Sequence, residues 1–516
     1  AAGRPAPDLL LVNAPLDGWG LAGGVYPSLS SLALGSFLGG QGLDVALLDP
    51  TVELVGDQEG GGRESGSREG RRPPDPVAVL EATARRVAEL RPRLLGITTM
   101  GVVEGRFAVA LARRVRTLLP ELPVALGGSW AAGAGPQVLA RFPWIDAVAR
   151  GPAEHALAAL LSAPAAPAAP TRPGPAGRAA WFSGHPGWFV RLAAGAHTSS
   201  LAAGEVLDTG PPPPLRPGQS PPLDLGLLAH PERYDTMVYV SARGCPFACR
   251  FCSEAFLFPG WMDEPLSKVA ADLAAFAARL PASYLWLCDP LFGASSRRLA
   301  ELLPLLSAGR TNFLFESRVD TLRPADLPAI RRAGGDLVYL GLEAVSDRSL
   351  VEIGKVRSPA AAARYREKAQ ALVAACAASD VLPVLGVLVP VPGDRPAELQ
   401  QTLSFLVELG RLAEAEARRA GTGISPFFHA FPYRVDPGTV AWRDFPRQAA
   451  TLGTTLSGDG EDPLEERNVR DASRELGRDA AAAFRDAVRG LNRPAPALLR
   501  RVLRSVPRPY LATEWG

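Results

Sequence analysis

Three of the chain's five cysteines lie within eight residues, in the segment Ser-Ala-Arg-Gly-Cys-Pro-Phe-Ala-Cys-Arg-Phe-Cys over 241–252. Thiolates of Cys245, Cys249 and Cys252 that converge from one loop can bind irons of a cubane iron–sulfur cluster. Such a cluster has one more iron than the loop has cysteines, so one iron stays open for a substrate or cofactor. The spacing therefore predicts catalysis rather than electron storage.

Two other uses of the cysteines fit the sequence less well. Structural zinc requires a closed set of ligands, and the nearest histidine, His230, lies on the far side of a predicted strand. Five cysteines in 516 residues do not make a secreted disulfide framework, and the chain begins without a charged or apolar export signal. The cluster is the preferred interpretation.

The spacing Cys-x3-Cys-x2-Cys, with Phe251 before the last cysteine, resembles the signature of the radical S-adenosylmethionine (SAM) superfamily. The resemblance implies that the open iron binds the amino and carboxylate groups of SAM, and that Phe251 lies at this site. It also implies an external electron donor of the flavodoxin or ferredoxin type. An electron from the reduced cluster would cleave the sulfonium to a 5′-deoxyadenosyl radical.

Composition favours a globular, multidomain enzyme. The apolar fraction is 47%, and the net charge of +2 comes from scattered acids and bases, so a nucleic-acid partner is not expected. We expect a small-molecule or peptide substrate. No uncharged apolar run of about 18 residues occurs, which predicts no membrane span and a cytoplasmic location.

Residues 1–160 alternate apolar runs with helical patterns, which predicts an α/β domain with a doubly wound parallel sheet of the flavodoxin or Rossmann type. Residues 161–232 are rich in Pro, Ala and Gly and favour a surface tether, with an aromatic stretch over 180–190 docked on a neighbouring domain. The predicted strands of the first domain are 8–14, 43–49, 93–99, 122–127 and 145–149, and its predicted helices are 28–40, 76–90, 104–119 and 135–142.

A second alternating pattern over 233–440 predicts a partial (β/α)6 barrel, and residues 441–516 predict a mainly helical C-terminal cap. In such barrels the functional residues lie at the carboxyl ends of the strands, and the cysteine loop follows the first strand directly. The predicted strands are 236–243, 283–288, 312–318, 336–343, 382–390 and 424–430.

Two later strands of the barrel region also resemble radical SAM enzymes. Glu316 and Arg318 alternate along one strand, so both can face the interior and meet the charged groups of SAM. The alternative is an internal ion pair. Glu343 ends the strand Leu-Gly-Leu-Glu, where the family commonly has an acid that binds the ribose of SAM; the alternative is a structural salt bridge with a barrel arginine.

Three further predictions concern the barrel. Val387 begins an apolar segment that resembles the one lying along the adenine of SAM. The Gly-Gly-Glu-like segment that many members use for the amino group of SAM is missing, and Asp289 is the candidate replacement. His429 and Tyr433 are candidate substrate contacts, although a strand-end histidine is more often structural. Cys288 could be a substrate-side thiol, whereas Cys376 is expected in the core.

A parallel-sheet domain ahead of a radical SAM barrel resembles the cobalamin-binding members of this superfamily. The Asp-x-His-x-x-Gly motif, whose histidine binds cobalt from below, is absent; residues 12–20 stand there, and no histidine precedes His155. Cobalt without a lower imidazole suits methyl transfer. The segments that resemble the family's cobalamin contacts contain Asp17, Thr98, Thr99, Met100, Gly127, Gly128, Ser129, Gly151 and Glu154.

These resemblances predict a cobalamin-dependent radical SAM C-methyltransferase with a [4Fe–4S] cluster, SAM and cobalamin. Its substrate would be an unactivated carbon of a natural-product intermediate or a peptide. The alternative within the family is a radical cyclisation, rearrangement or oxidation without methylation. A non-catalytic cobalamin or iron–sulfur carrier is the alternative from another class, although such a carrier has no use for an open iron beside a ribose-binding acid.

Overall fold

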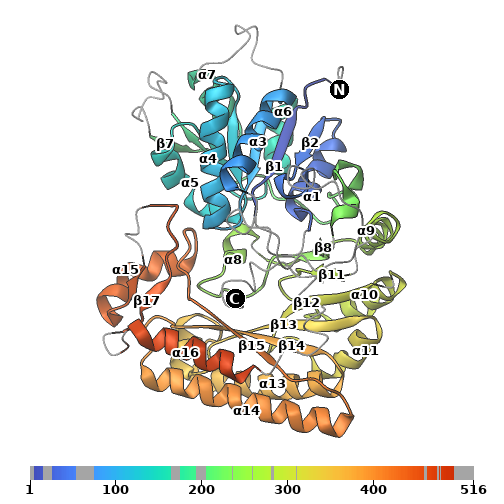
Figure 1. The fold of residues 1–516 in the computed structure, drawn as a ribbon, viewed down its shortest axis with the longest axis vertical. Helices are drawn as coiled ribbons and strands as arrows, with labels where there is room; N and C mark the ends of the chain where they lie inside the picture. The colour runs from blue at the N-terminus through green and yellow to red at the C-terminus, as the bar shows by residue number, and fades with distance from the viewer. Residues whose placement is uncertain are drawn as a thin grey trace. The chain divides into compact units, whose positions relative to one another are not determined.

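The chain forms two compact units, each with its own sheet (Figure 1). One unit covers the residues up to 235 and a short C-terminal segment with Pro463 and Leu464, and the other covers most of the chain from Thr236 onward. The computed structural model describes residues 5–15, 26–53, 75–163, 175–192, 205–234, 236–258, 260–280, 284–309, 311–457, 462–473, 476 and 478–492.

Five parallel strands form the main part of the first unit's sheet, in the order β2-β1-β3-β4-β5. Their sequences are short runs of Leu, Val, Ile and Ala, as expected for strands that are covered on both faces. The strands are β1 (Leu9–Asn13), β2 (Val45–Leu48), β3 (Leu94–Thr98), β4 (Val124–Gly127) and β5 (Ala147–Ala149).

Alternate residues of each strand pack on opposite faces of this sheet. Leu10 and Val12 belong to a core shared with α3, α4 and α5, whereas Leu9 and Leu11 belong to a core shared with α1, α6 and α7. The doubly wound fold predicted from the sequence is confirmed. The helices are α1 (Leu29–Gly39), α2 (Pro50–Glu53), α3 (Pro76–Leu90), α4 (Val102–Leu118), α5 (Ser129–Arg141), α6 (Glu154–Ser162) and α7 (Pro175–Ser183).

The segment over 161–232 differs from the tether that its composition predicts. Strands β6 (Trp188–Arg191) and β7 (Val206–Asp208) extend the first unit's sheet: β6 pairs antiparallel with β5, and β7 pairs antiparallel with β6. Phe182 and Trp188 are fully buried, with ring centroids 5.1 Å apart. The aromatic stretch therefore completes its own unit, because burying large rings outweighs the weak strand propensity of the surrounding Pro, Ala and Gly.

The second unit contains six parallel strands in the order β8-β11-β12-β13-β14-β15, with β8 and β15 at the edges. A six-stranded parallel sheet that stays open between its edge strands is the partial barrel that the sequence predicts. The strands are β8 (Thr236–Tyr239), β11 (Tyr284–Leu287), β12 (Asn312–Arg318), β13 (Gly335–Glu343), β14 (Leu382–Leu388) and β15 (Phe427–Phe431).

Helices follow these strands in sequence, and the yellow and orange ribbons of Figure 1 show them along the outside of the sheet. They are α9 (Leu266–Arg279), α10 (Ser296–Ala308), α11 (Leu327–Arg332), α12 (Asp347–Glu352), α13 (Pro359–Ala378) and α14 (Pro396–Ala420). Within the described helices of both units, none is long and apolar enough to cross a membrane.

The C-terminal region is helical, as predicted, with one short antiparallel pair in addition. Helix α16 packs against β15 and α14, and the Asn492 side chain both accepts from and donates to the Phe428 backbone at 2.9 Å. This amide occupies hydrogen-bonding groups on the edge strand β15. The elements are α15 (Val440–Leu452), β16 (Thr455–Leu456), β17 (Val469–Asp471) and α16 (Arg478–Leu491).

Candidate active site

The three clustered cysteines lie in one loop of the second unit, between the two-residue strand β9 (Ala242–Arg243) and the short helix α8 (Glu254–Leu257). Cys249 is buried, and Cys245 and Cys252 are partly exposed. Burial, together with the neighbouring thiols Cys249 and Cys245, raises the pKa of Cys252 to about 12. Thiols in such a setting ionise readily only when a cation compensates the charge, which bound iron does.

Three cysteine thiolates are the donor set of a cubane iron–sulfur cluster with one open iron. Among the described residues, no three His, Cys, Asp or Glu side chains are grouped as they would be around one metal ion. In a cubane each thiolate binds its own iron, so the sulfurs need not meet at one point. The donor set is therefore suited to an iron–sulfur cluster.

The backbone of the cysteine loop is fixed at its start. Gly244 has a φ of +77°, and a Cβ at this position would overlap the carbonyl oxygen of Gly260. Its N–H donates to the Glu254 carboxylate at 3.0 Å, which ties the two ends of the loop together. Burial raises the pKa of Glu254, and the hydrogen bond from Gly244 opposes that change.

The middle of the loop is held by other parts of the second unit. The Arg250 N–H donates to the Ile353 carbonyl at 2.9 Å, and the Arg250 carbonyl accepts from the Ala441 N–H at 2.7 Å. The Arg250 guanidinium also pairs with Asp444 on α15. The cysteines are thus presented by a loop that is attached at several points.

Arg318, at the end of β12, lies directly beside the cysteine loop. Its Nη1 donates to the Cys249 sulfur at 3.2 Å, and its guanidinium lies 3.7 Å from the centre of the Phe247 ring. Asp320 accepts from Nε and Nη2 of the same guanidinium at 2.9 and 3.1 Å. The structure therefore places Arg318 against Cys249, a predicted cluster ligand, and its predicted contact with SAM stays a prediction.

Glu343 ends β13 with a φ of +65°, a backbone conformation that is uncommon for a residue with a side chain. Its carboxylate pairs with the Lys355 ammonium at 3.1 Å. A Cβ on Gly341 would overlap the Glu343 carboxylate and lie 3.0 Å from the Lys355 nitrogen, so glycine leaves the space that this pair uses. Its ion-pair partner is thus a lysine, not the arginine considered from sequence, and the ribose role of Glu343 stays a prediction.

Glu316 faces Trp286, whose indole N–H donates to its carboxylate at 3.0 Å. Burial, with a smaller contribution from the charges of Asp289 and Glu254, raises the pKa of Glu316 to about 7, and the hydrogen bond from Trp286 opposes the rise. Burial and the Glu316 charge also raise the pKa of Cys288, which stands next to the same group. The acid is therefore poised to exchange a proton near neutral pH.

Substituting Glu316 with glutamine should change how stability depends on pH. Because its folded pKa lies above the unfolded value of 4.5, its proton stabilises the folded state fully below pH 4.5, and this contribution is lost as pH rises through about 7. As pH rises from 5 to 8, the free energy of unfolding of E316Q should therefore increase by roughly 1–3 kcal/mol relative to that of the native chain, measured by urea unfolding. The control E301Q alters an exposed helix residue and should gain nothing; equal pH slopes for E316Q and the native chain would contradict the assignment.

Asp289 and Val387 occupy buried positions in the barrel. Asp289 accepts hydrogen bonds from the Ser241 hydroxyl and from the N–H groups of Ser241 and Ala242, so it holds the approach to the cysteine loop. Burial raises its pKa to about 6. Val387 is fully buried in β14. Their predicted contacts with the amino group and adenine of SAM stay predictions.

The candidate substrate residues are also packed within the second unit. Burial lowers the pKa of His429 to about 4, so its imidazole is neutral, and its ring centroid lies 3.7 Å from that of Phe431. Tyr433 is 1% exposed and contacts Phe251 edge to face, with centroids 6.0 Å apart. Tyr433 thus supports the loop residue Phe251, and direct substrate contacts by His429 and Tyr433 stay predictions.

The carboxyl edge of the first unit's sheet contains the residues predicted for cobalamin. The Thr99 hydroxyl donates to the Gly127 carbonyl and the Ser129 hydroxyl donates to the Met100 carbonyl, both at 2.8 Å. Gly128 has a φ of +94°, and a Cβ there would overlap the Thr99 carbonyl oxygen.

Because the backbone of Gly128 lies so close to that of Thr99, there is little room for large side chains at this edge. Met100, which is 54% exposed, is the exception. Thr98 is the last residue of β3 and pairs in register with Gly127. A glycine-containing edge with few bulky side chains fits a large flat ligand. Domains with open sheets of this kind bind their ligands at the carboxyl edge. The individual contacts stay predictions.

Three other predicted cobalamin residues have different outcomes. Gly151 follows β5, and Glu154 is buried in the first turn of α6. Asp17 lies outside the described residues. The ends of β5 and α6 thus add Gly151 and Glu154 to the same carboxyl side of the sheet.

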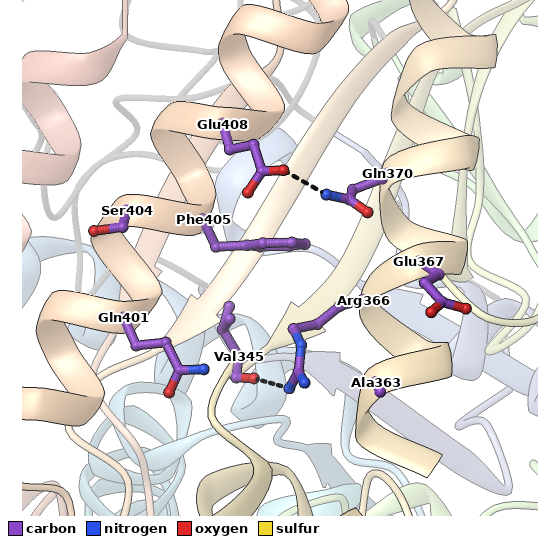
Figure 2. Close-up of a pocket in the computed structure, with 9 residues that line it drawn as sticks. All are labelled: Val345, Ala363, Arg366, Glu367, Gln370, Gln401, Ser404, Phe405 and Glu408. Carbon is purple, nitrogen blue, oxygen red and sulfur yellow. Dashed lines mark hydrogen bonds between the residues drawn. The ribbon is translucent and has the colours of Figure 1, made fainter. Parts of the chain in front are cut away.

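A groove between α13 and α14 belongs to neither candidate site. Figure 2 shows a hydrogen bond from Gln370 to Glu408 across the groove and another from Arg366 to the Val345 carbonyl. Their donor–acceptor distances are 2.7 and 2.9 Å. These polar groups bind one another, and no cysteine lines the groove.

Sequence reasoning missed three residues at the cysteine loop. Phe247 and Lys355 contact Arg318, and Glu254 binds Gly244. Only Glu254 had a local signal, as an acid two residues after the last cysteine. The other two contacts depend on how distant strands and loops meet.

Two protein families match the chain. The family described as the B12 binding domain matches residues 20–161, and the radical SAM superfamily matches residues 239–406. Each match lies within one of the two units.

Two curated relatives match the chain over only part of their own length. The anaerobic magnesium-protoporphyrin IX monomethyl ester cyclase of Rubrivivax gelatinosus is 25% identical over 288 residues, which are 52% of this chain and 47% of the relative. An uncharacterized methyltransferase of Pyrococcus horikoshii is 26% identical over 210 residues, which are 40% of this chain and 41% of the relative. The match spans less than half of either relative.

Solved structures match nearly the whole chain. The radical SAM methyltransferase TsrM from Kitasatospora setae, with cobalamin and a [4Fe–4S] cluster bound, has a TM-score of 0.65 at 16% identity, over 94% of this chain and 91% of TsrM. The cobalamin-dependent radical enzyme OxsB has a TM-score of 0.64 at 14% identity, over 93% of this chain and 65% of OxsB. These likenesses establish a shared fold.

The two family matches fall on the two features built above from the residues, the glycine-containing sheet edge and the cysteine loop. Residues 20–161 thus match a B12 binding domain and residues 239–406 a radical SAM domain, and the cofactors of such a chain are a [4Fe–4S] cluster, SAM and cobalamin.

Proposed function

We propose that the chain is a cobalamin-dependent radical SAM C-methyltransferase that acts on an unactivated carbon of a natural-product intermediate or a peptide. The observation that carries the proposal is the presence, in one chain, of a cobalamin-type sheet edge and a cysteine loop, in a fold shared over 94% of the chain with the methyltransferase TsrM. The match to a methyltransferase of Pyrococcus horikoshii supports the same reaction class.

Each group of residues has a defined role in this proposal. Cys245, Cys249 and Cys252 would hold the cluster, and Glu343 would hold the ribose of SAM after releasing Lys355. The edge around Gly128 would accept the corrin. When bound, the cluster supplies an electron to SAM, and cobalamin supplies a transferable methyl group. The protein contributes binding, orientation and exclusion of water.

The test uses the full chain, reconstituted without oxygen with iron, sulfide and hydroxocobalamin and then desalted. Iron and cobalt per chain are measured first, and the protein is then incubated with a reductant, SAM carrying a trideuterated methyl group, and candidate small molecules. Tryptophan is a suitable first probe because TsrM has been solved with tryptophan as substrate. The proposal expects a product that carries the labelled methyl group, together with S-adenosylhomocysteine. Iron without cobalt would overturn it.

A second function is a radical cyclisation, rearrangement or oxidation that transfers no methyl group. The match to the magnesium-protoporphyrin ester cyclase favours this alternative. The same incubation separates the two reactions. A cyclisation or oxidation would give 5′-deoxyadenosine and an unlabelled product without S-adenosylhomocysteine.

A further inference from the structure

Arg318 is held in one orientation by groups on three sides. Asp320 binds Nε and Nη2, and the Lys355 carbonyl accepts from Nη2 at 2.9 Å. The ring of Phe247 covers the guanidinium, and the Arg318 side chain is 6% exposed. In this orientation Nη1 is directed at the Cys249 sulfur, at 3.2 Å. The contact is therefore a fixed feature of the site.

A cationic donor on a thiolate changes the properties of the cluster that the thiolate binds. Uptake of one electron makes the cluster one unit more negative, and a guanidinium N–H on a ligand sulfur stabilises that extra charge. Hydrogen bonds to the sulfurs are among the factors that set the reduction potential of iron–sulfur clusters. A buried donor acts more strongly than an exposed one, since water screens it less.

Lys355 connects this arginine to Glu343. Its backbone carbonyl binds Arg318, and its ammonium, on a side chain that is 4% exposed, pairs with Glu343 at 3.1 Å. The two ends of one residue thus contact the group beside the cluster and the predicted ribose acid. A ligand that takes Glu343 away from the Lys355 ammonium must change the electrostatic surroundings of Arg318.

We propose that Arg318 is a positioning residue that raises the reduction potential of the cluster through Cys249, and that Lys355 transmits the occupancy of Glu343 to it. The first part rests on cluster binding by the cysteine trio, and the second also rests on the SAM contact at Glu343. Neither part depends on methyl transfer, so failure of the methyltransferase assay leaves the proposal intact.

The test is a dithionite titration of the reconstituted full chain, followed by electron paramagnetic resonance of the reduced cluster. R318Q should have a midpoint potential more negative than the native chain at equal iron content. The matched control is R323Q, because Arg323 binds Asp326 through the same two nitrogens, Nε and Nη2, but is exposed and distant in sequence from the loop. R323Q should titrate like the native chain. An unshifted R318Q would overturn the first part.

If R318Q binds too little iron, D320N decides the question. This variant keeps the Arg318 charge and removes its bidentate partner, so the potential should shift in the same negative direction by a smaller amount. An unshifted D320N would then count against the proposal.

The link through Lys355 is tested by adding SAM. The native chain should show a change in midpoint potential on SAM addition, and K355M should show a smaller change, because its Glu343 has no ammonium to exchange. K268M is the control, since Lys268 forms another buried pair, with Asp272 at 2.6 Å on α9. An equal response to SAM in K355M and the native chain would overturn the link.

Discussion

Cys249→Ala is expected to abolish formation of 5′-deoxyadenosine and to lower the iron content well below that of the native chain. Cys249 is the buried member of the trio and the one that Arg318 contacts, so its loss removes an iron ligand and leaves a buried guanidinium facing a methyl group. With only two of its three protein ligands, the cluster would no longer have one defined iron that is open to SAM. The measurement is 5′-deoxyadenosine by liquid chromatography, with iron per chain, after anaerobic reconstitution.

Cys376→Ala is the matched control for this experiment. Cys376 is fully buried in α13, away from the loop, and its removal costs a small core volume but no cluster ligand. It should keep both its iron and its 5′-deoxyadenosine activity. Persistent turnover by a reconstituted C249A protein would show that the trio does not hold the catalytic cluster.

Strands that are covered on both faces of a sheet could be predicted from the sequence. β12 agrees with the predicted range at both ends, and β1, β3, β4 and β13 agree within one or two residues, because each is a short apolar run between turn-forming segments. β6 and β7 were missed because Pro, Ala and Gly dominate their surroundings. β6 is a strand because it pairs with the edge of β5, and β7 because it pairs with β6.

The site shows the same division between local and distant information. The cysteine spacing is local, so the loop and its chemistry could be predicted directly. Arg318 was predicted as an interior residue, but its contact with Cys249 depends on where β12 ends relative to a loop 69 residues earlier. The pairing of Lys355 with Glu343 likewise depends on the positive φ of Glu343 and the missing side chain at Gly341.

Gly244→Ala should reduce both bound iron and 5′-deoxyadenosine formation by at least about tenfold. The φ of +77° is unfavourable for alanine by roughly 1–2 kcal/mol, and the new Cβ would also overlap the Gly260 carbonyl oxygen, which is backbone and cannot rotate away. The loop must therefore shift next to Cys245. The measurement is iron per chain after reconstitution, with a thermal melt to show that the rest of the unit remains folded.

Gly421→Ala separates loop geometry from general backbone strain. Gly421 has a similar φ of +70° at the end of α14, but a Cβ there would meet no atom within 4 Å. The control should lose about 1 kcal/mol of stability and keep its iron, because only the conformational cost is shared. If G244A and G421A retain equal iron, the close approach of Gly244 to Gly260 does not shape the cluster loop. If only G244A loses iron, the cluster depends on a glycine that lies outside the cysteine spacing itself.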